Sequence, residues 1–445
     1  MQRRIGLAVA IALVPGMALA HATERAVILT LPTGWSIAGA AAAVALTGLV
    51  AAIAPRRAPP APRLLASRRH LLPAGSGSWL AALAFLGLLV TGIFGSRDPL
   101  ANPLVLGFWI ALRVALVLAC LGFGDLWKPI NPWTAPVAWT RARLGRTGGI
   151  GLARLGYWPA VAGAFALAWF EIVALAPTDP AGLARTLGLY WLLIFGLAVL
   201  EGESWLDRGE VLSVHFSFLG RIAPLWRESD ATAVRWKIGL PGAQILAMPP
   251  LPPSGAAFVV VALAAVSFDG LSETFRWLAL IGVNPLEFPG RSAVTGVNTL
   301  GLLAACAITG ALVLGAAALG RHLAGRGGGF WRDTGFWVLS FLPIAAGYHA
   351  AHYLVALLTD GQYILAALAG TPGHGAHFGF LQDRTAVTLI WSTQVALILG
   401  AHVLAVLLGM RLVAPESPRA HLPMTLLMVG LTAFGLWLLA APAGA

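Results

Sequence analysis

The chain has 445 residues, of which 58% are hydrophobic and only 11% are charged. Soluble proteins carry about 25% charged residues, so this composition excludes a soluble globular enzyme and favours a helical membrane protein. The two cysteines, Cys120 and Cys306, lie in apolar stretches and not in a CxxC pair, which argues against a disulfide framework or a thiolate metal site. The net charge of +11 fits basic cytoplasmic loops, and we expect no nucleic-acid partner.

The first twenty residues have the pattern of a secretory signal peptide. A short basic head is followed by the apolar stretch Ile5–Met17 and by Ala18-Leu19-Ala20, a small-x-small sequence of the type that signal peptidase cleaves. We therefore predict a signal peptide at residues 1–20 and a periplasmic N-terminal segment at residues 21–33. The alternative is that the first twenty residues stay on the protein as an uncleaved helix.

Ten further apolar stretches of about 20 residues predict an all-α, polytopic membrane protein with about ten transmembrane helices. They are Gly34–Ala54, Ser78–Gly95, Pro103–Gly122, Tyr157–Ala176, Leu183–Leu200, Ala256–Leu278, Asn298–Leu319, Gly335–Leu358, Ala386–Met410 and Leu422–Leu439. We take residues 34–445 as a single transmembrane helical domain, with Leu206–Gly255 as its longest connection.

The basic residues favour one orientation of these helices. When the mature N-terminus lies outside, most Lys and Arg residues fall in the connections that strict alternation puts inside. Positive residues gather in the cytoplasmic loops of membrane proteins. The sequence therefore predicts a multi-pass protein of the bacterial inner membrane with a periplasmic N-terminus.

Ionisable side chains inside the predicted helices are candidate site residues, because such groups are costly in lipid unless they are paired or hydrated. His349 and His352 are three residues apart, so both imidazoles share one helix face and are able to bind one metal ion. Asp269 and Glu273 are four residues apart and share a face in the same way. The alternatives are packing histidines for the first pair and a solvated helix end for the second.

Further residues at the same outer depth extend this candidate site. Glu171 lies within an apolar stretch, where it suits a proton acceptor or a ligand, and a backbone hydrogen bond is its alternative role. The loop histidines are either ligands or simply solvated. We predict Glu171 and Glu273 as catalytic residues, and a divalent metal, zinc or copper, bound by His349, His352, Asp269, His374, His377 and His21.

Two other residues receive different roles from the sequence. Arg113 is the only charged residue in the middle of its apolar stretch, and it must find a partner or water. We expect a structural contact with Asp125 or with a backbone carbonyl. His215 belongs to the predicted inner connection, so we exclude it from the site.

Four segments taken together resemble a family of bacterial multi-pass membrane proteins. They are Gly124–Trp133, Trp205–Glu210 followed by Arg221, Ser267–Ser272 and Tyr348–Tyr353. The family is named after the membrane subunit of fenitrothion hydrolase, a two-subunit system that degrades organophosphates, and the resemblance covers most of the chain from the second apolar stretch onward. It implies a metal-dependent phosphotriester hydrolase with a second protein subunit as a partner, and it assigns no catalytic residue.

The predicted mature start, His21-Ala22, is similar to that of small periplasmic copper-binding proteins. In those proteins the terminal amine and the imidazole of the first histidine chelate copper. The tether from His21 to the first apolar stretch is long enough for this histidine to join the other ligands or to stay in solvent.

We therefore expect an inner-membrane metal-dependent hydrolase with its site at the periplasmic face. A metal-bound hydroxide would attack a phosphorus or carbonyl centre, and hydrophobic small-molecule substrates would arrive through the membrane lipid. The absence of a P-loop and of a GxSxG elbow argues against nucleotide and serine-hydrolase chemistry. The alternatives are a copper-handling or metal-transport protein and a non-catalytic membrane subunit of a larger complex.

Overall fold

A computed structural model describes residues 28, 31–53, 58–69, 73–230, 232–284, 290–373, 377–413 and 418–442. The predicted signal peptide, His21 and most of the predicted periplasmic segment lie outside these residues.

Eight helices among the described residues are long and apolar enough to cross a membrane, which identifies an all-α, multi-pass membrane protein. They are α3 (Thr33–Ile53), α4 (Ser76–Phe94), the continuous run of α5 (Pro103–Leu106), η1 (Gly107–Leu116) and α6 (Val117–Phe123), α9 (Pro180–Glu201), α13 (Pro253–Ser272), α15 (Arg291–Leu323), α19 (Arg384–Leu412) and the run Arg419–Ala440 that contains α20 (Leu422–Ala440).

The remaining predicted helices are bent or short. The segments α16 (Phe330–Ser340), α17 (Leu342–His352) and α18 (Leu354–Leu368) form a span only together, with a bend of 57° before α18. The helix α8 (Trp158–Ile172) has 15 residues. All ten predicted stretches coincide with helices, but eight reach full length without a break, so the number of ten crossings stays a prediction.

Short polar residues and prolines define where several helices begin. The side chains of Asn102, Asp179 and Asp383 accept hydrogen bonds from the backbone amides of Leu104, Gly182 and Ala386 at 2.9, 2.6 and 2.8 Å. These are N-caps, which satisfy amides that have no partner inside the helix. Prolines at the first positions of α5 and α9 fit the same role, since proline has no amide hydrogen to leave unpaired.

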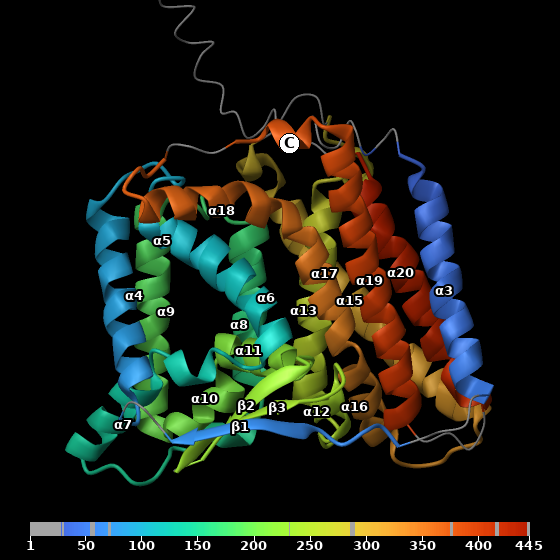
Figure 1. Ribbon diagram of the computed structural model, residues 1–445, viewed down its shortest axis with the longest axis horizontal. Helices are drawn as coiled ribbons and strands as arrows, with labels where there is room; N and C mark the ends of the chain where they lie inside the picture. The colour runs from blue at the N-terminus through green and yellow to red at the C-terminus, as the bar shows by residue number, and fades with distance from the viewer. Residues whose placement is uncertain are drawn as a thin grey trace, which may run out of the picture.

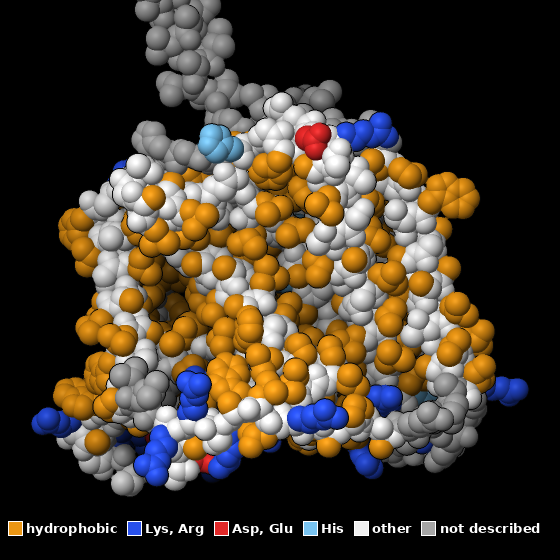
Figure 2. All heavy atoms as spheres, in the orientation of Figure 1, with side chains coloured by type: hydrophobic (Ala, Val, Ile, Leu, Met, Phe, Trp, Pro, Cys, Tyr) orange, Lys and Arg blue, Asp and Glu red, His pale blue; other side chains and the backbone are white. Residues whose placement is uncertain are grey.

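The helices stand between two rims of different character (Figure 1). One rim carries α7 (Thr134–Arg143) and an antiparallel sheet of order β1-β3-β2, formed by β1 (Arg63–Arg69), β2 (Leu225–Ser229) and β3 (Ala233–Ile238). Figure 2 shows Lys and Arg side chains along this rim, which we call the basic rim. At the opposite rim, α18 lies across the top of the bundle, against α5 and η1.

The predicted connection Leu206–Gly255 is not a simple loop. It folds into α10 (Leu206–Gly209), α11 (Val211–Gly220), β2, β3 and α12 (Ala243–Leu246). The helix α11 packs inside the bundle against α6, α8 and α17. Eight of its ten residues are buried, because a helix that is apolar on all sides is stable only when it is surrounded.

Close helix packing in the centre depends on small residues. A Cβ atom added at Gly347 of α17 would lie 2.4 Å from the Cβ of Ala401 in α19 and 3.0 Å from the carbonyl oxygen of Leu397. The two backbones approach this closely because neither residue carries a long side chain at the contact, as is common between membrane helices. Gly347 therefore sets the position of α17, which carries two of the candidate site residues.

We predict that Gly347→Leu lowers the stability of the protein by about 1–3 kcal/mol, because the added side chain overpacks the contact between α17 and α19. The midpoint of thermal unfolding in detergent measures this. The matched control is Gly400→Leu in α19, where an added Cβ meets nothing within 4 Å. Equal midpoints for the two variants would contradict the packing role.

Candidate functional site

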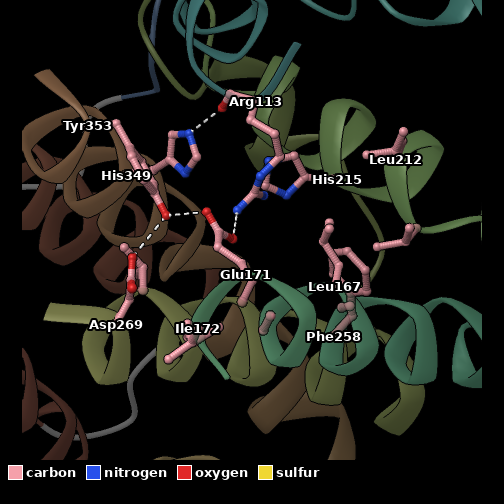
Figure 3. Close-up of a pocket in the computed structure, with 16 residues that line it drawn as sticks. Arg113, Leu167, Glu171, Ile172, Leu212, His215, Phe258, Asp269, His349 and Tyr353 are labelled. Atoms are coloured by element: carbon pink, nitrogen blue, oxygen red, sulfur yellow. Dashed lines mark hydrogen bonds and ion pairs between the residues drawn. The ribbon is translucent and has the colours of Figure 1, made fainter. Parts of the chain in front are cut away.

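Several helices bring ionisable side chains together inside the bundle, as Figure 3 shows. In chain order the residues are Arg113 from η1, Glu171 from α8, His215 from α11, Asp269 from α13, His349 and His352 from α17, and Tyr353 at the bend between α17 and α18. These residues come from segments that are far apart in the sequence, so only the folded bundle brings them together.

Arg113 and Glu171 form an ion pair whose side chains are 14% and 16% exposed. The expected partner of Arg113 was Asp125 or a backbone carbonyl, and this prediction is wrong. Arg113 lies in η1, a π-helical segment, and such segments are frequent at functional sites. Its own carbonyl oxygen accepts a hydrogen bond from His349 Nε2 at 2.7 Å, which fixes the proton of that imidazole on Nε2.

Glu171 reaches the site because α8 ends inside the bundle. The guanidinium of Arg291, from α15, donates to the carbonyl oxygens of Glu171 and Ala174 at 2.8 and 3.1 Å. These carbonyls belong to the C-terminal turn of the helix, where cations are favourable because they satisfy free acceptors and the helix dipole. A short helix can therefore end here without leaving its last carbonyls unpaired.

Tyr353 links the two buried carboxyl groups. Its hydroxyl lies 2.8 Å from Glu171 Oε1 and 3.0 Å from Asp269 Oδ2. On the other side, Asp269 Oδ2 accepts a hydrogen bond from His352 Nε2 at 2.9 Å. A continuous chain of contacts thus runs from Arg113 through Glu171, Tyr353 and Asp269 to His352.

From this chain of contacts we infer a proton on one of the carboxyl groups. A tyrosine hydroxyl carries one hydrogen and can donate to one acceptor only, yet Tyr353 lies within hydrogen-bonding distance of two carboxyl oxygens. If both groups were ionised, one of the two contacts would bring lone pairs together. A proton shared between Glu171 and Asp269 satisfies both contacts, and such sharing is the basis of acid–base chemistry.

The network borders a cavity of about 70 Å³, which apolar residues of α8, α11 and α13 also line. This volume is large enough for water, since a cavity needs at least about 10–15 Å³ to admit one molecule. Arg113 Nε and His215 Nε2 are buried and have no hydrogen-bond partner among the residues that the structure describes. Buried polar atoms are rarely left without a partner, and the described protein atoms leave these two nitrogens unsatisfied.

The structure gathers four of the eight predicted site residues. Glu171, Asp269 and His349 line the cavity, and His352 joins them through Asp269. The predicted catalytic residue Glu273 is exposed at the end of α13 and does not line the cavity. His377 is also exposed, in a loop whose backbone bonds to Gln362. His21 and His374 lie outside the described residues.

Among the described residues, the predicted metal ligands do not form a ligand set. His352 is bonded to Asp269, and His349 to the Arg113 carbonyl. No group of three or more His, Cys, Asp or Glu side chains in the described ranges is placed to hold a metal ion. These residues, as arranged, do not fit a metal, and the zinc or copper ion stays a prediction.

Three residues of the site, Arg113, His215 and Tyr353, were missed by reasoning from the sequence. The exclusion of His215 is wrong, since it lines the cavity and its ring centroid lies 6.0 Å from that of His349. The signal was present in Val211–Gly220, a mostly apolar run without Asp, Glu, Lys or Arg inside a charged connection. No local pattern marks Tyr353 as a bridge between two carboxyl groups from distant parts of the sequence.

Comparison of this chain with protein-family models, with curated proteins and with solved structures finds no match. The chemistry of the site therefore rests on its own geometry.

We predict that Glu171→Gln destabilises the protein by about 3–5 kcal/mol, because it leaves the Arg113 charge buried without its counterion. The double variant Arg113→Gln/Glu171→Gln should recover much of this loss, since it buries no net charge. Unfolding in detergent gives the three stabilities. The control Arg235→Gln breaks an exposed ion pair with Asp230 and should cost at most about 1 kcal/mol. A double variant as unstable as the single one would contradict the counterion role.

We also predict that the folded protein holds a protonated carboxyl group at neutral pH. Infrared difference spectroscopy detects the carbonyl stretch of such a group, and Glu171→Gln or Asp269→Asn should remove or shift the band. Glu203→Gln, which changes a carboxylate with 48% exposure, should leave it in place. A spectrum without a protonated-carboxyl band would show that both groups are ionised, contrary to the sharing of one proton.

Proposed function

We propose that this chain is an integral-membrane hydrolase of apolar esters, with the cavity beside Arg113 as its active site. The proposal is carried by one observation, that Arg113 and His215 line the same cavity while Arg113 Nε and His215 Nε2 have no hydrogen-bond partner in the described part of the chain. An arginine N–H only donates, so it calls for an oxygen acceptor such as a phosphoryl or carbonyl oxygen. An unpartnered imidazole nitrogen is a general base for water.

The proposed reaction follows from these two atoms and the shared proton. Water in the cavity gives a proton to His215 Nε2 and its oxygen to the phosphorus or carbonyl centre. Arg113 Nε–H donates to the oxygen on which negative charge develops, a form of stabilisation that is strong in a dry site. As the ester bond breaks, the leaving oxygen takes a proton from the Tyr353 network, and the proton on His215 returns to that network through water.

The substrate class is an uncharged ester that dissolves in the bilayer. Leu167, Leu212 and Phe258 line the cavity beside the polar groups, and Figure 2 shows an apolar hollow between α9 and α6 on one face of the molecule. The cavity holds only the reacting centre and water, so the ester arms must extend toward the lipid. The family resemblance suggests phosphotriesters, and it also suggests a second protein subunit.

The same proposal includes a location in the membrane. The basic rim faces the cytoplasm, as positive residues do in membrane proteins, and the opposite rim with α18 faces the periplasm of a bacterial inner membrane. This orientation agrees with ten crossings and with a periplasmic N-terminus after signal-peptide cleavage. The site lies among the helices of the bundle, which suits a substrate that dissolves in the lipid.

A proton-coupled transporter is the second candidate, and the broken helices favour it. Tyr353 lies at the 57° bend between α17 and α18, Arg113 lies in a π-helical segment, and α11 is a short helix inside the bundle. Transporters place their sites at such interruptions, with protonatable residues beside them. A movement of α18 would then break the contacts of Tyr353 and release the shared proton.

We predict that the purified protein in nanodiscs releases 4-nitrophenolate from a dialkyl 4-nitrophenyl phosphate. His215→Gln should lower the rate about 10²–10⁴-fold, as expected for loss of a general base. His402→Gln is the control, because His402 is a fully buried histidine that does not line the cavity. The proposed hydrolase activity would be contradicted if the unsubstituted protein did not hydrolyse the ester, or if the two variants hydrolysed it at equal rates.

The same purified protein also tests the second candidate function, proton-coupled transport. In proteoliposomes with an internal pH dye, proton flux that Tyr353→Phe abolishes and Tyr348→Phe preserves would favour transport. Tyr348 lies on the same helix but donates to the carbonyl oxygen of Leu431, away from the network. Metal analysis of the parent protein and of His349→Ala tests the predicted zinc or copper.

A further inference from the structure

A second and larger cavity lies at the basic rim, separate from the proposed active site. Its volume is about 560 Å³, within the range of small-molecule sites, and residues from α11, the sheet and the segment after α6 line it. It shares no residue with the cavity beside Arg113. The question is what its lining would bind.

The lining contains four cationic side chains, Lys128, Arg221, Arg227 and Lys237, but only two carboxylates, Asp125 and Glu228. The cavity therefore has an excess of about two positive charges.

One carboxylate and one cation neutralise each other. Lys237 Nζ lies 2.8 Å from Glu228 Oε2, and this hydrogen bond lowers the pKa of the Glu228 carboxyl. Asp125 accepts a hydrogen bond from the backbone amide of Lys128 at 3.0 Å. Burial raises the pKa of the Asp125 carboxyl, which weakens it as a counterion for the remaining cations.

The two arginines are the uncommitted groups. Both backbones are hydrogen-bonded, but neither the Arg221 nor the Arg227 side chain makes a hydrogen bond or an ion pair with any residue in the ranges that the structure describes. Arginine presents a planar fork of N–H donors that matches phosphate oxygens two at a time. A phosphate monoester carries close to two negative charges at neutral pH, which complements the two arginines.

We propose that this cavity is a binding site for a phosphate-bearing anion, held by Arg221 and Arg227 with Lys128 at its edge. The phosphate belongs either to a lipid headgroup, which the basic rim would meet at the membrane surface, or to a soluble phosphate ester. The site is independent of the hydrolysis proposed above, because none of its residues takes part in that reaction.

The test measures binding to the full-length protein in nanodiscs of neutral phosphatidylcholine. One arm titrates radiolabelled glycerol 3-phosphate, and the other replaces part of the lipid with phosphatidic acid and counts retained lipid by native mass spectrometry. Saturable binding in the first arm identifies a soluble ester as the ligand, and selective retention in the second identifies a lipid headgroup.

Arg221→Gln and Arg227→Gln should each weaken the binding at least about tenfold, the loss expected for a charge-assisted contact. Arg227→Lys keeps the charge and should retain part of the affinity if the strand is intact. The matched control is Arg235→Gln in β3, whose side chain pairs with Asp230 and does not line the cavity. Absence of binding in both arms, or an equal loss for Arg235→Gln, would overturn the proposal.

Discussion

The ion pair between Arg113 and Glu171 is the contact around which the centre of this protein is arranged. Two unit charges in an apolar bundle are tolerable only as a hydrogen-bonded pair, and the surrounding helices meet that requirement in unusual ways. A π-helical segment carries Arg113, and α8 stops at the depth of its carboxylate, with Arg291 donating to its last carbonyls. Irregular backbone is thus concentrated where polar groups must be satisfied inside the membrane.

The remaining acidic groups are coupled to a bend in the chain. Tyr353 separates α17 from α18 and contacts both Glu171 and Asp269, so the residue at the bend is also the one that connects the two carboxyl groups. An enzyme would use this coupling to hold an acid in place, and a transporter would use it to release one. Hydrolysis and transport would therefore use the same hydrogen-bonded network. This explains why both candidate functions involve the same residues.

The short helix α11 forms a wall between two cavities. His215 faces the cavity beside Arg113, and Ser217 and Gly220 face the cavity at the basic rim. The C-terminal end of α11 is held tightly, because a Cβ atom added at Gly220 would lie 2.5 Å from the backbone nitrogen of Asp125. Any molecule bound at the basic rim would contact the helix that also carries the proposed base, so the two sites share a structural element while their residues remain distinct.

The sequence alone determined the membrane class, the places of the helices and four residues of the site. Apolar runs of sufficient length must be buried in lipid or protein, and Glu171, Asp269, His349 and His352 are conspicuous because they interrupt such runs. Tertiary structure alone decided the partner of Arg113, the inclusion of His215 and the bridging role of Tyr353. Arg113 and Glu171 are 58 positions apart, and no helical period relates side chains on different helices. The tertiary structure also decided the burial of α11. A mostly apolar helix of ten residues is too short to span a bilayer, and it becomes stable only when neighbouring helices surround it.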